Sequence, residues 1–135
     1  MRKWPEVFVL LVLFVFHLTG CRGESTAFKQ IQQQQAGDYR FTLLNDTGTV
    51  KQRKDHLRME FRSTSTNEMA NVNNLQIQTS MHMPGMGPMF GNLSSIRQVS
   101  PGRYEFDAYF SMAGQWNFLV TFDPNGHVQF NLSAQ

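Results

Sequence analysis

The chain has 135 residues, with 12 lysines and arginines against 10 aspartates and glutamates, a formal net charge of +2 at pH 7. This balance excludes the strongly basic surface that nucleic-acid binding requires. Cys21 is the only cysteine, which excludes an intramolecular disulfide. We therefore expect one modest domain that is stabilised by packing alone and does not bind nucleic acid.

The first twenty residues have the pattern of a secretory signal. Two basic residues precede an uncharged run over residues 7–18, which at about 1.5 Å per residue is too short to cross a hydrocarbon core of about 30 Å. The sequence LTGC at residues 18–21 resembles the bacterial lipobox, which implies cleavage before Cys21 and lipidation of that residue. We expect residues 1–20 to be a lipoprotein signal peptide. The mature chain is then held by lipid in the cell envelope, facing the periplasm or the extracellular side.

The stretch that follows Cys21 is polar and rich in glutamine. We expect residues 21–37 to be the lipidated cysteine and a flexible tether, which as a coil would span on the order of 20 Å. The plainer alternative is a low-complexity tail whose only role is to connect anchor and domain. On either interpretation the folded domain covers residues 38–135.

From Tyr39 onward the apolar residues alternate with a period of two, which is typical of strands with one buried face. The expected strands lie around residues 39–43, 57–61, 75–81, 93–99, 104–110, 116–122 and 128–132. Clusters of Asn, Asp, Gly, Pro and Ser mark turns between several of them. No segment keeps a 3.6-residue apolar period. The sequence predicts an all-β, immunoglobulin-like antiparallel β-sandwich of about seven strands without a disulfide.

The segment MHMPGMGPM, residues 81–89, holds four of the eight methionines. Met59 and Met81 lie on alternating strands and are expected to fill the core. Pro84 should end the third strand, so Met86 and Met89 are expected on a loop that cannot easily bury them. Exposed apolar side chains in such a loop favour a role in binding an ion or a partner.

Counting antiparallel strands predicts where this loop lies. The loop at residues 84–92 and the turn around Met112 should meet at one end of the sandwich. His56 is expected at that same end and His127 at the opposite one. Two methionine segments that are distant in sequence are therefore expected to share one rim.

Thioether sulfur is a soft, neutral donor that selects Cu(I) or Ag(I) over harder divalent ions. It also suits an oxidising compartment, in which thiolates would be oxidised. The candidate metal ligands are Met83, Met86, Met89 and Met112, with His82 ranked below them and His56 lower still. The alternative is a methionine surface that docks a partner protein without any ion.

The C-terminal half resembles the YtkA-like domain, related to FixH. The resemblance rests on an M-P-x-M loop, G-x-Y and F-x-M-x-G-x-W, here Met83, Pro84, Met86, Gly102, Tyr104, Phe110, Met112, Gly114 and Trp116. It implies an extracytoplasmic β-sandwich of a kind often linked to copper handling, heavy-metal efflux or cytochrome oxidase assembly. Where the family often has a histidine, this chain has Met89, which favours Cu(I) over Cu(II). Apart from the resemblance, Tyr104 and Trp116 are expected to pack the core or cover the rim, and Gly114 to form a tight turn.

No nucleophile elbow, zinc-binding helix motif or phosphate loop is present in the sequence, so we do not expect an enzyme. Two functions stay open. The first is a lipid-anchored Cu(I) carrier, metallochaperone or sensor. The second is a non-catalytic interaction module of a membrane-associated efflux or oxidase-assembly complex, without metal.

Overall fold

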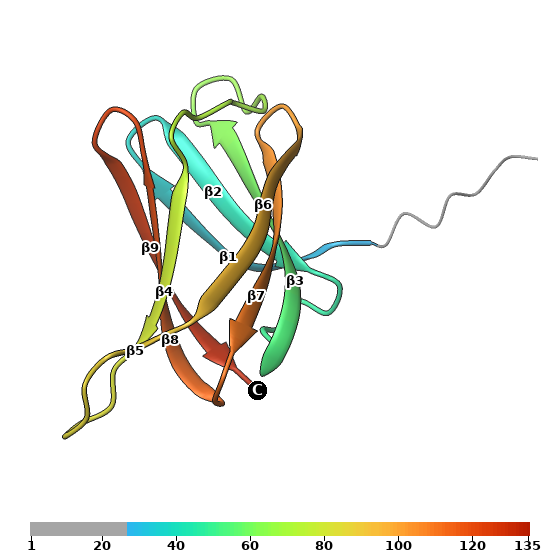
Figure 1. Ribbon diagram of the computed structural model, residues 1–135. Helices are drawn as coiled ribbons and strands as arrows, with labels where there is room; N and C mark the ends of the chain where they lie inside the picture. Colours follow the sequence, from blue (N-terminus) through green and yellow to red (C-terminus); the bar gives the residue numbers. More distant parts are fainter. Residues whose placement is uncertain (1–26) are drawn as a thin grey trace, which may run out of the picture.

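The computed structural model describes residues 27–135, so the predicted signal peptide and Cys21 lie outside the described residues. The described part consists of nine strands and contains no helix (Figure 1). They are β1 (Lys29–Ala36), β2 (Tyr39–Asn45), β3 (Arg53–Ser63), β4 (Gln76–Met81), β5 (Met89–Phe90), β6 (Asn92–Ser100), β7 (Arg103–Phe110), β8 (Gly114–Phe122) and β9 (Gly126–Ala134). Within residues 27–135 there is accordingly no apolar helix of membrane-spanning length.

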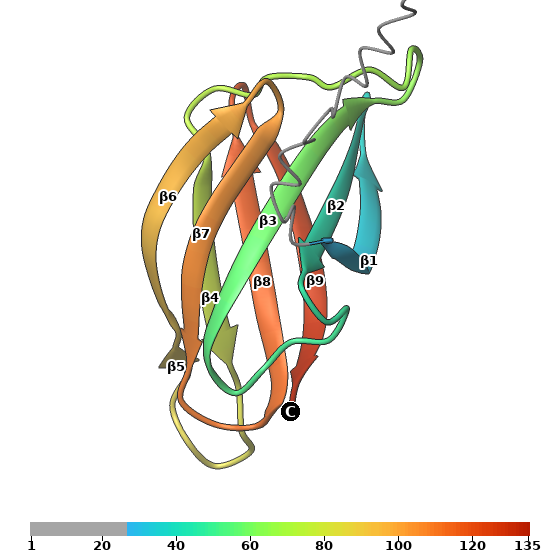
Figure 2. The ribbon, with the colours of Figure 1, turned by 90° about the vertical axis from the view of Figure 1, so that its right-hand side faces the viewer.

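The strands form two antiparallel sheets packed face to face (Figures 1 and 2). The five-stranded sheet has the order β1-β2-β3-β7-β6, and the four-stranded sheet has the order β5-β4-β8-β9. The predicted all-β antiparallel sandwich without a disulfide is confirmed. All seven predicted strands are present, and β1 and β5 are additional.

β1 corrects part of the predicted flexible tether of residues 21–37, because residues 29–36 form a strand. Lys29 to Ala36 pair with β2 from Asn45 back to Tyr39, with a bulge at Gln30 and Gln32. This edge strand is held by backbone hydrogen bonds, which glutamine supports as well as any residue, while Ile31 and Ala36 pack against the core. A strand with so few buried side chains leaves no apolar alternation in the sequence.

The core lies between the sheets and is dominated by aromatic rings. Phe41 and Phe61 pack edge to face with centroids 4.9 Å apart, and Phe122 from the opposite sheet lies 5.2 Å from Phe41. Met59 is fully buried and Met81 is 4% exposed, which confirms both as core residues. Aromatic contacts across the two layers replace the cross-link that the chain lacks.

The loop between β2 and β3 joins the end of β9 and so connects the two sheets. Val50 forms a parallel bridge with Ala134, the amide of Gln52 donates to the carbonyl of Gln135 at 2.7 Å, and the amide of Gln135 donates to Val50 at 3.0 Å. We call this contact the β9 clasp. Fully buried Asn45 orders the loop: its amide group donates to the Thr49 carbonyl and to Asp55, and its oxygen accepts from the Gly48 amide.

Candidate functional site

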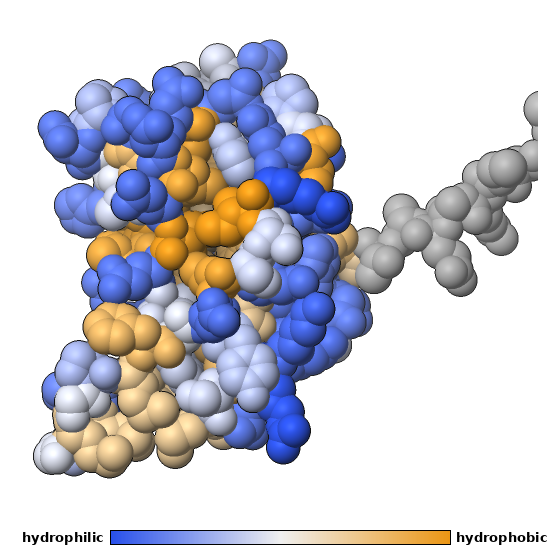
Figure 3. Space-filling model, viewed as in Figure 1, coloured by the Kyte–Doolittle hydropathy of each residue, from blue (hydrophilic) through white to orange (hydrophobic). Residues whose placement is uncertain are grey.

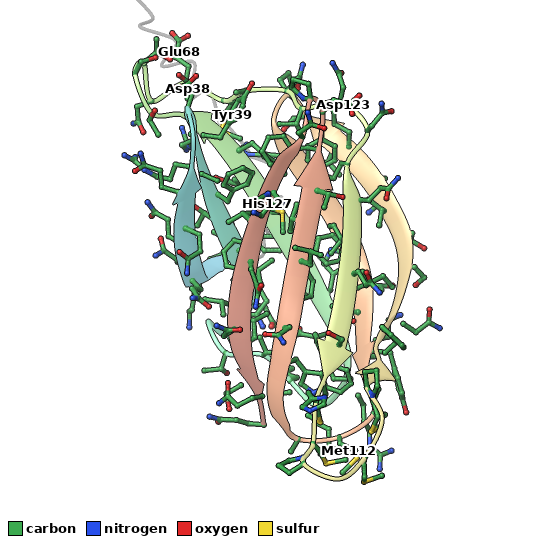
Figure 4. The ribbon with its side chains drawn as sticks, turned by 90° about the vertical axis from the view of Figure 1, so that its left-hand side faces the viewer. Asp38, Tyr39, Glu68, Met112, Asp123 and His127 are labelled. Carbon is green, nitrogen blue, oxygen red and sulfur yellow. The ribbon has the colours of Figure 1, made fainter. Side chains whose placement is uncertain are left out.

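The β4–β5 loop, residues 82–88, and the β7–β8 turn, residues 111–113, lie at the same end of the sandwich (Figure 2). The two segments adjoin at their bases, because a Cβ built on Gly114 would lie 3.0 Å from the terminal methyl carbon of Met81. Met112 lies at this end in Figure 4, and His127 lies toward the other. The predicted sharing of one rim by the two methionine segments is therefore found.

The β7–β8 turn is held from the core. The indole Nε1–H of Trp116 donates to the carbonyl of Met112 at 3.0 Å, and its ring packs edge to face against Phe110 at 5.3 Å. Gly114 has φ of +132°, so the predicted tight turn is found. The backbone of Met112 is thus fixed, while the residue is 40% exposed. The F-x-M-x-G-x-W residues together present this methionine to solvent.

The G-x-Y residues act at the opposite end. The Tyr104 hydroxyl donates to the carbonyl of Val72 at 3.1 Å, and Tyr104 is 7% exposed, as its predicted core position requires. At Gly102, where φ is +69°, an added Cβ would come within 2.8 Å of the Phe61 carbonyl oxygen and 2.9 Å of the backbone of Ala70. These residues shape the fold and stand apart from the methionine end.

The β4–β5 loop extends away from the body of the sandwich, toward the lower left of Figure 1. Its tip is a turn in which the amide of Met86 donates to the carbonyl of Met83 at 3.1 Å. A Cβ built on Gly85 or Gly87 meets nothing within 4 Å, and Met86 is 58% exposed. The loop tip therefore has room to move, in contrast to the turn that carries Met112.

The other predicted ligands differ in exposure. Met83 and Met89 are half-buried and pack against the core, and His82 is exposed. The expectation that Met89 lies on a loop is wrong, because it belongs to β5 and pairs with the core residue Met81. Its side chain shares the inward side of Met81, which the sequence could not show without the register of this short hairpin. The exposed methionines at this end are Met86 and Met112.

The two methionine segments carry no charged side chain, although exposed Arg53 pairs with Phe110 beside the β7–β8 turn. Residues 69–96 and 108–122 contain no Asp, Glu, Lys or Arg, and across residues 27–135 no three His, Cys, Asp or Glu side chains are grouped as a metal site. Phe90 is also exposed there, at 62%. Apolar surface accordingly gathers at the lower left of Figure 3. The donors available here are soft, and the surroundings are apolar.

His56 lies near the start of β3, which begins at the methionine end because Arg53 pairs with Phe110. Its ring belongs to an ionic network on the outer face of the five-stranded sheet, with Nδ1 2.8 Å from Asp107 and Nε2 3.4 Å from Glu105. This outer face is separate from the rim that carries the two methionine segments. Sequence reasoning missed the network because cross-strand partners depend on the register.

The network perturbs both carboxyl groups. Burial acts to raise the pKa of Glu105, but the guanidinium of Arg58, 2.6 Å away, and then His56 outweigh it, so the pKa lies below its ordinary value. The hydrogen bond from His56, followed by that from Lys54, lowers the pKa of Asp107. Both groups are thus held as carboxylates on this face.

A family model described as YtkA-like matches residues 32–121, a stretch that begins within β1 and includes the methionine loop and the β7–β8 turn. The match extends over most of the sandwich, and its start agrees with the assignment of β1 to the domain. No curated protein matches the chain.

Proposed function

The chain belongs to the YtkA-like family, and on that premise we propose that it is a lipid-anchored, extracytoplasmic Cu(I)-binding carrier, metallochaperone or sensor. The proposed ligands are the sulfurs of the exposed residues Met86 and Met112, with Met83 and Met89 at the base of the loop and His82 beside them. The proposed anchor is lipid on Cys21. Its partner would be a heavy-metal efflux or cytochrome oxidase assembly protein.

The observation that carries this proposal is the presence of two exposed methionines, Met86 and Met112, on two uncharged segments at one end of the sandwich. Thioethers favour Cu(I) because both the donor and the ion are soft. A neutral site also offers nothing that would attract Ca²⁺ or Mg²⁺, which require oxygen ligands.

The two segments are supported differently, which suggests how an ion is bound and released. The hydrogen bond from Trp116 fixes the backbone of Met112, whereas nothing lies within 4 Å of a Cβ built on Gly85 or Gly87. In Figure 1 the loop projects away from the turn, so one shared ion requires the loop to fold back. Opening the loop again would pass the ion to a partner by ligand exchange.

A Cu(I) titration in competition with a chelator tests the proposal. The double variant Met86→Leu/Met112→Leu removes both sulfurs but keeps apolar side chains of similar volume, so Cu(I) affinity should fall at least about tenfold, equivalent to about 1.4 kcal/mol. Met69→Leu is the matched control, because Met69 is half-buried beside Arg62 at the opposite end. Equal competition by the double variant and the wild type would contradict the metal site.

The second candidate function is a metal-free interaction module. The exposed ring of Phe90 favours it, because it extends the apolar surface beyond the methionines. The double leucine variant separates the two functions, since it removes two of the proposed sulfur ligands but preserves an apolar surface. Phe90→Ser should weaken partner binding and leave the Cu(I) titration unchanged.

A further inference from the structure

We propose that the outer face of the five-stranded sheet, centred on β3 and β7, lies against an anionic phospholipid surface. The inference rests on the lipid anchor at Cys21 put forward in the proposed function, and adds the face of the domain that the membrane meets. Figure 2 looks onto this face.

The first argument is the distribution of charge between the two sheets. The outward positions of the five-stranded sheet carry six cationic side chains, on Arg40, Lys54, Arg58, Arg62, Arg97 and Arg103. Three carboxylates share the face, on Glu60, Glu105 and Asp107, so its formal net charge is +3. No strand of the four-stranded sheet contains Asp, Glu, Lys or Arg. One face is basic, and the opposite face is neutral and rich in amides.

The second argument is that these cations remain accessible. The side chains of Lys54 and Arg97 are 72% and 67% exposed, although each lies near a carboxylate, at 3.2 Å from Asp107 and 3.5 Å from Glu105. Three carboxylates cannot neutralise six cations. The surplus charge is therefore available to lipid phosphates, which attract basic groups within a Debye length of about 8 Å.

The third argument is the place at which the chain enters the domain. The ring of Phe28 stacks on the guanidinium of Arg58, 3.7 Å from the ring centroid, and lies 6.2 Å from the ring of His56. It lines a hollow of about 330 Å³ together with Lys54 and Glu105. The chain thus reaches the sandwich on the basic face and not at either end.

The length of chain between anchor and domain restricts the orientation further. Residues 22–27 separate Cys21 from Phe28, and even fully extended this connection reaches only about 25 Å. The two sheets are about 10 Å apart, with a layer of side chains outside each. To turn the neutral face toward lipid, the connection would have to run around the edge of the sandwich. Both the short connection to Cys21 and the distribution of charge therefore favour an orientation in which the basic face meets the lipid.

This orientation has a consequence for the methionine end. The β4–β5 loop belongs to the four-stranded sheet, and in Figure 1 it projects on the opposite side from the start of the described chain. With the basic face on lipid, the loop points away from the headgroups. It is then accessible to a soluble or membrane-protein partner.

The test uses the full acylated chain in vesicles of phosphatidylcholine, with or without phosphatidylglycerol, and single-cysteine reporters that react with a polymer-linked maleimide. Ser94→Cys reports on the basic face, beside Lys54 and Asp107, and Asn131→Cys reports on the neutral face. On anionic vesicles the reporter at position 94 should react at least about fivefold more slowly than the one at 131. Half-molar salt should abolish the difference, because it screens charge.

A charge-matched pair of variants identifies the cause. Lys54→Gln/Arg97→Gln and Gln78→Glu/Gln129→Glu lower the net charge by the same amount, on opposite faces. The first pair should remove the protection at position 94 and the second should leave it. Equal reactivity of the two reporters on anionic vesicles, or protection at position 131, would overturn the proposal.

The same preparations distinguish this proposal from the proposed function. Absence of an acylated mass at Cys21, together with failure to float with vesicles, would overturn the anchor and with it this orientation. Protection at position 94 combined with unchanged Cu(I) competition in the leucine variants would overturn the metal site alone.

Discussion

At the scale of single residues, Trp116 connects the core to the exposed methionine turn. Trp116→Phe keeps an aromatic ring beside Phe110 but removes the hydrogen bond to the carbonyl of Met112. The smaller ring also leaves a cavity, so the free energy of unfolding should fall by about 2–3 kcal/mol in urea titrations.

The same variant bears on the candidate site. If the fixed turn matters for ion binding, Trp116→Phe should weaken Cu(I) competition even though both sulfurs are retained. Gln115→Ala, at an exposed neighbouring position, is the control and should alter neither measurement. A Trp116→Phe protein with wild-type stability would show that this hydrogen bond does not hold the turn.

At the scale of elements, β3 and β7 are joined by the Glu105 and Asp107 network, which makes their pairing sensitive to acid. Both carboxyl groups have a pKa below the ordinary value in the folded chain. Their contribution to stability is therefore complete above the unfolded pKa of about 4, and it is lost as the pH falls through the folded-state values. The urea midpoint should fall steadily as the pH is lowered from 5 toward about 2.

The variant Glu105→Gln tests whether the Glu105 carboxylate contributes to this acid sensitivity. The amide cannot titrate, so the variant should be less stable at neutral pH, and its midpoint should change less between neutral and acidic pH. Asp38→Asn, in the exposed β1–β2 turn and outside this network, serves as the control. If the urea midpoint of Glu105→Gln depends on pH as steeply as that of the wild type, groups other than Glu105 cause the acid sensitivity.

The elements also show what could be predicted from sequence. β2, β3, β7, β8 and β9 each bury one face, so apolar alternation marked them. β1 was missed because glutamines such as Gln33 and Gln35 pair through the backbone and bury little. At the candidate site, antiparallel counting was sufficient to bring Met112 and the loop to one end. It could not show that Met89 turns inward, because that depends on the two-residue strand β5.

At the scale of the whole molecule, charge is segregated between the two layers. The period-two pattern fixes which residues point outward but not which strands are neighbours, so the basic face appears only once β3 and β7 are paired in register. The uncharged stretches at residues 69–96 and 108–122 were visible in the sequence. The pairing of β4 and β8, which lie in these stretches, is a property of the fold.

Asn45 offers a whole-molecule test, because the loop it orders carries the β9 clasp. Asn45→Asp is nearly isosteric, but it replaces the amide that donates to Asp55 at 3.0 Å with a second carboxylate, in a fully buried position. The free energy of unfolding should fall by about 3 kcal/mol at neutral pH. Acid should partly relieve the loss, because protonation removes the repulsion. A stability loss that is equal at pH 5 and pH 8, measured by urea unfolding, would contradict this account.

The β9 clasp also has a temporal consequence for a chain that emerges amino-terminus first, from a ribosome or through an export channel. The backbone amide of Gln52 donates to Gln135, so this contact between the early strands and β9 cannot form until residue 135 has been released. Until then β2 and β3 expose the rings that β8 and β9 will cover, and they are a natural substrate for holding chaperones. The slowest stage in the folding of this sandwich is therefore expected to be the arrival of β9.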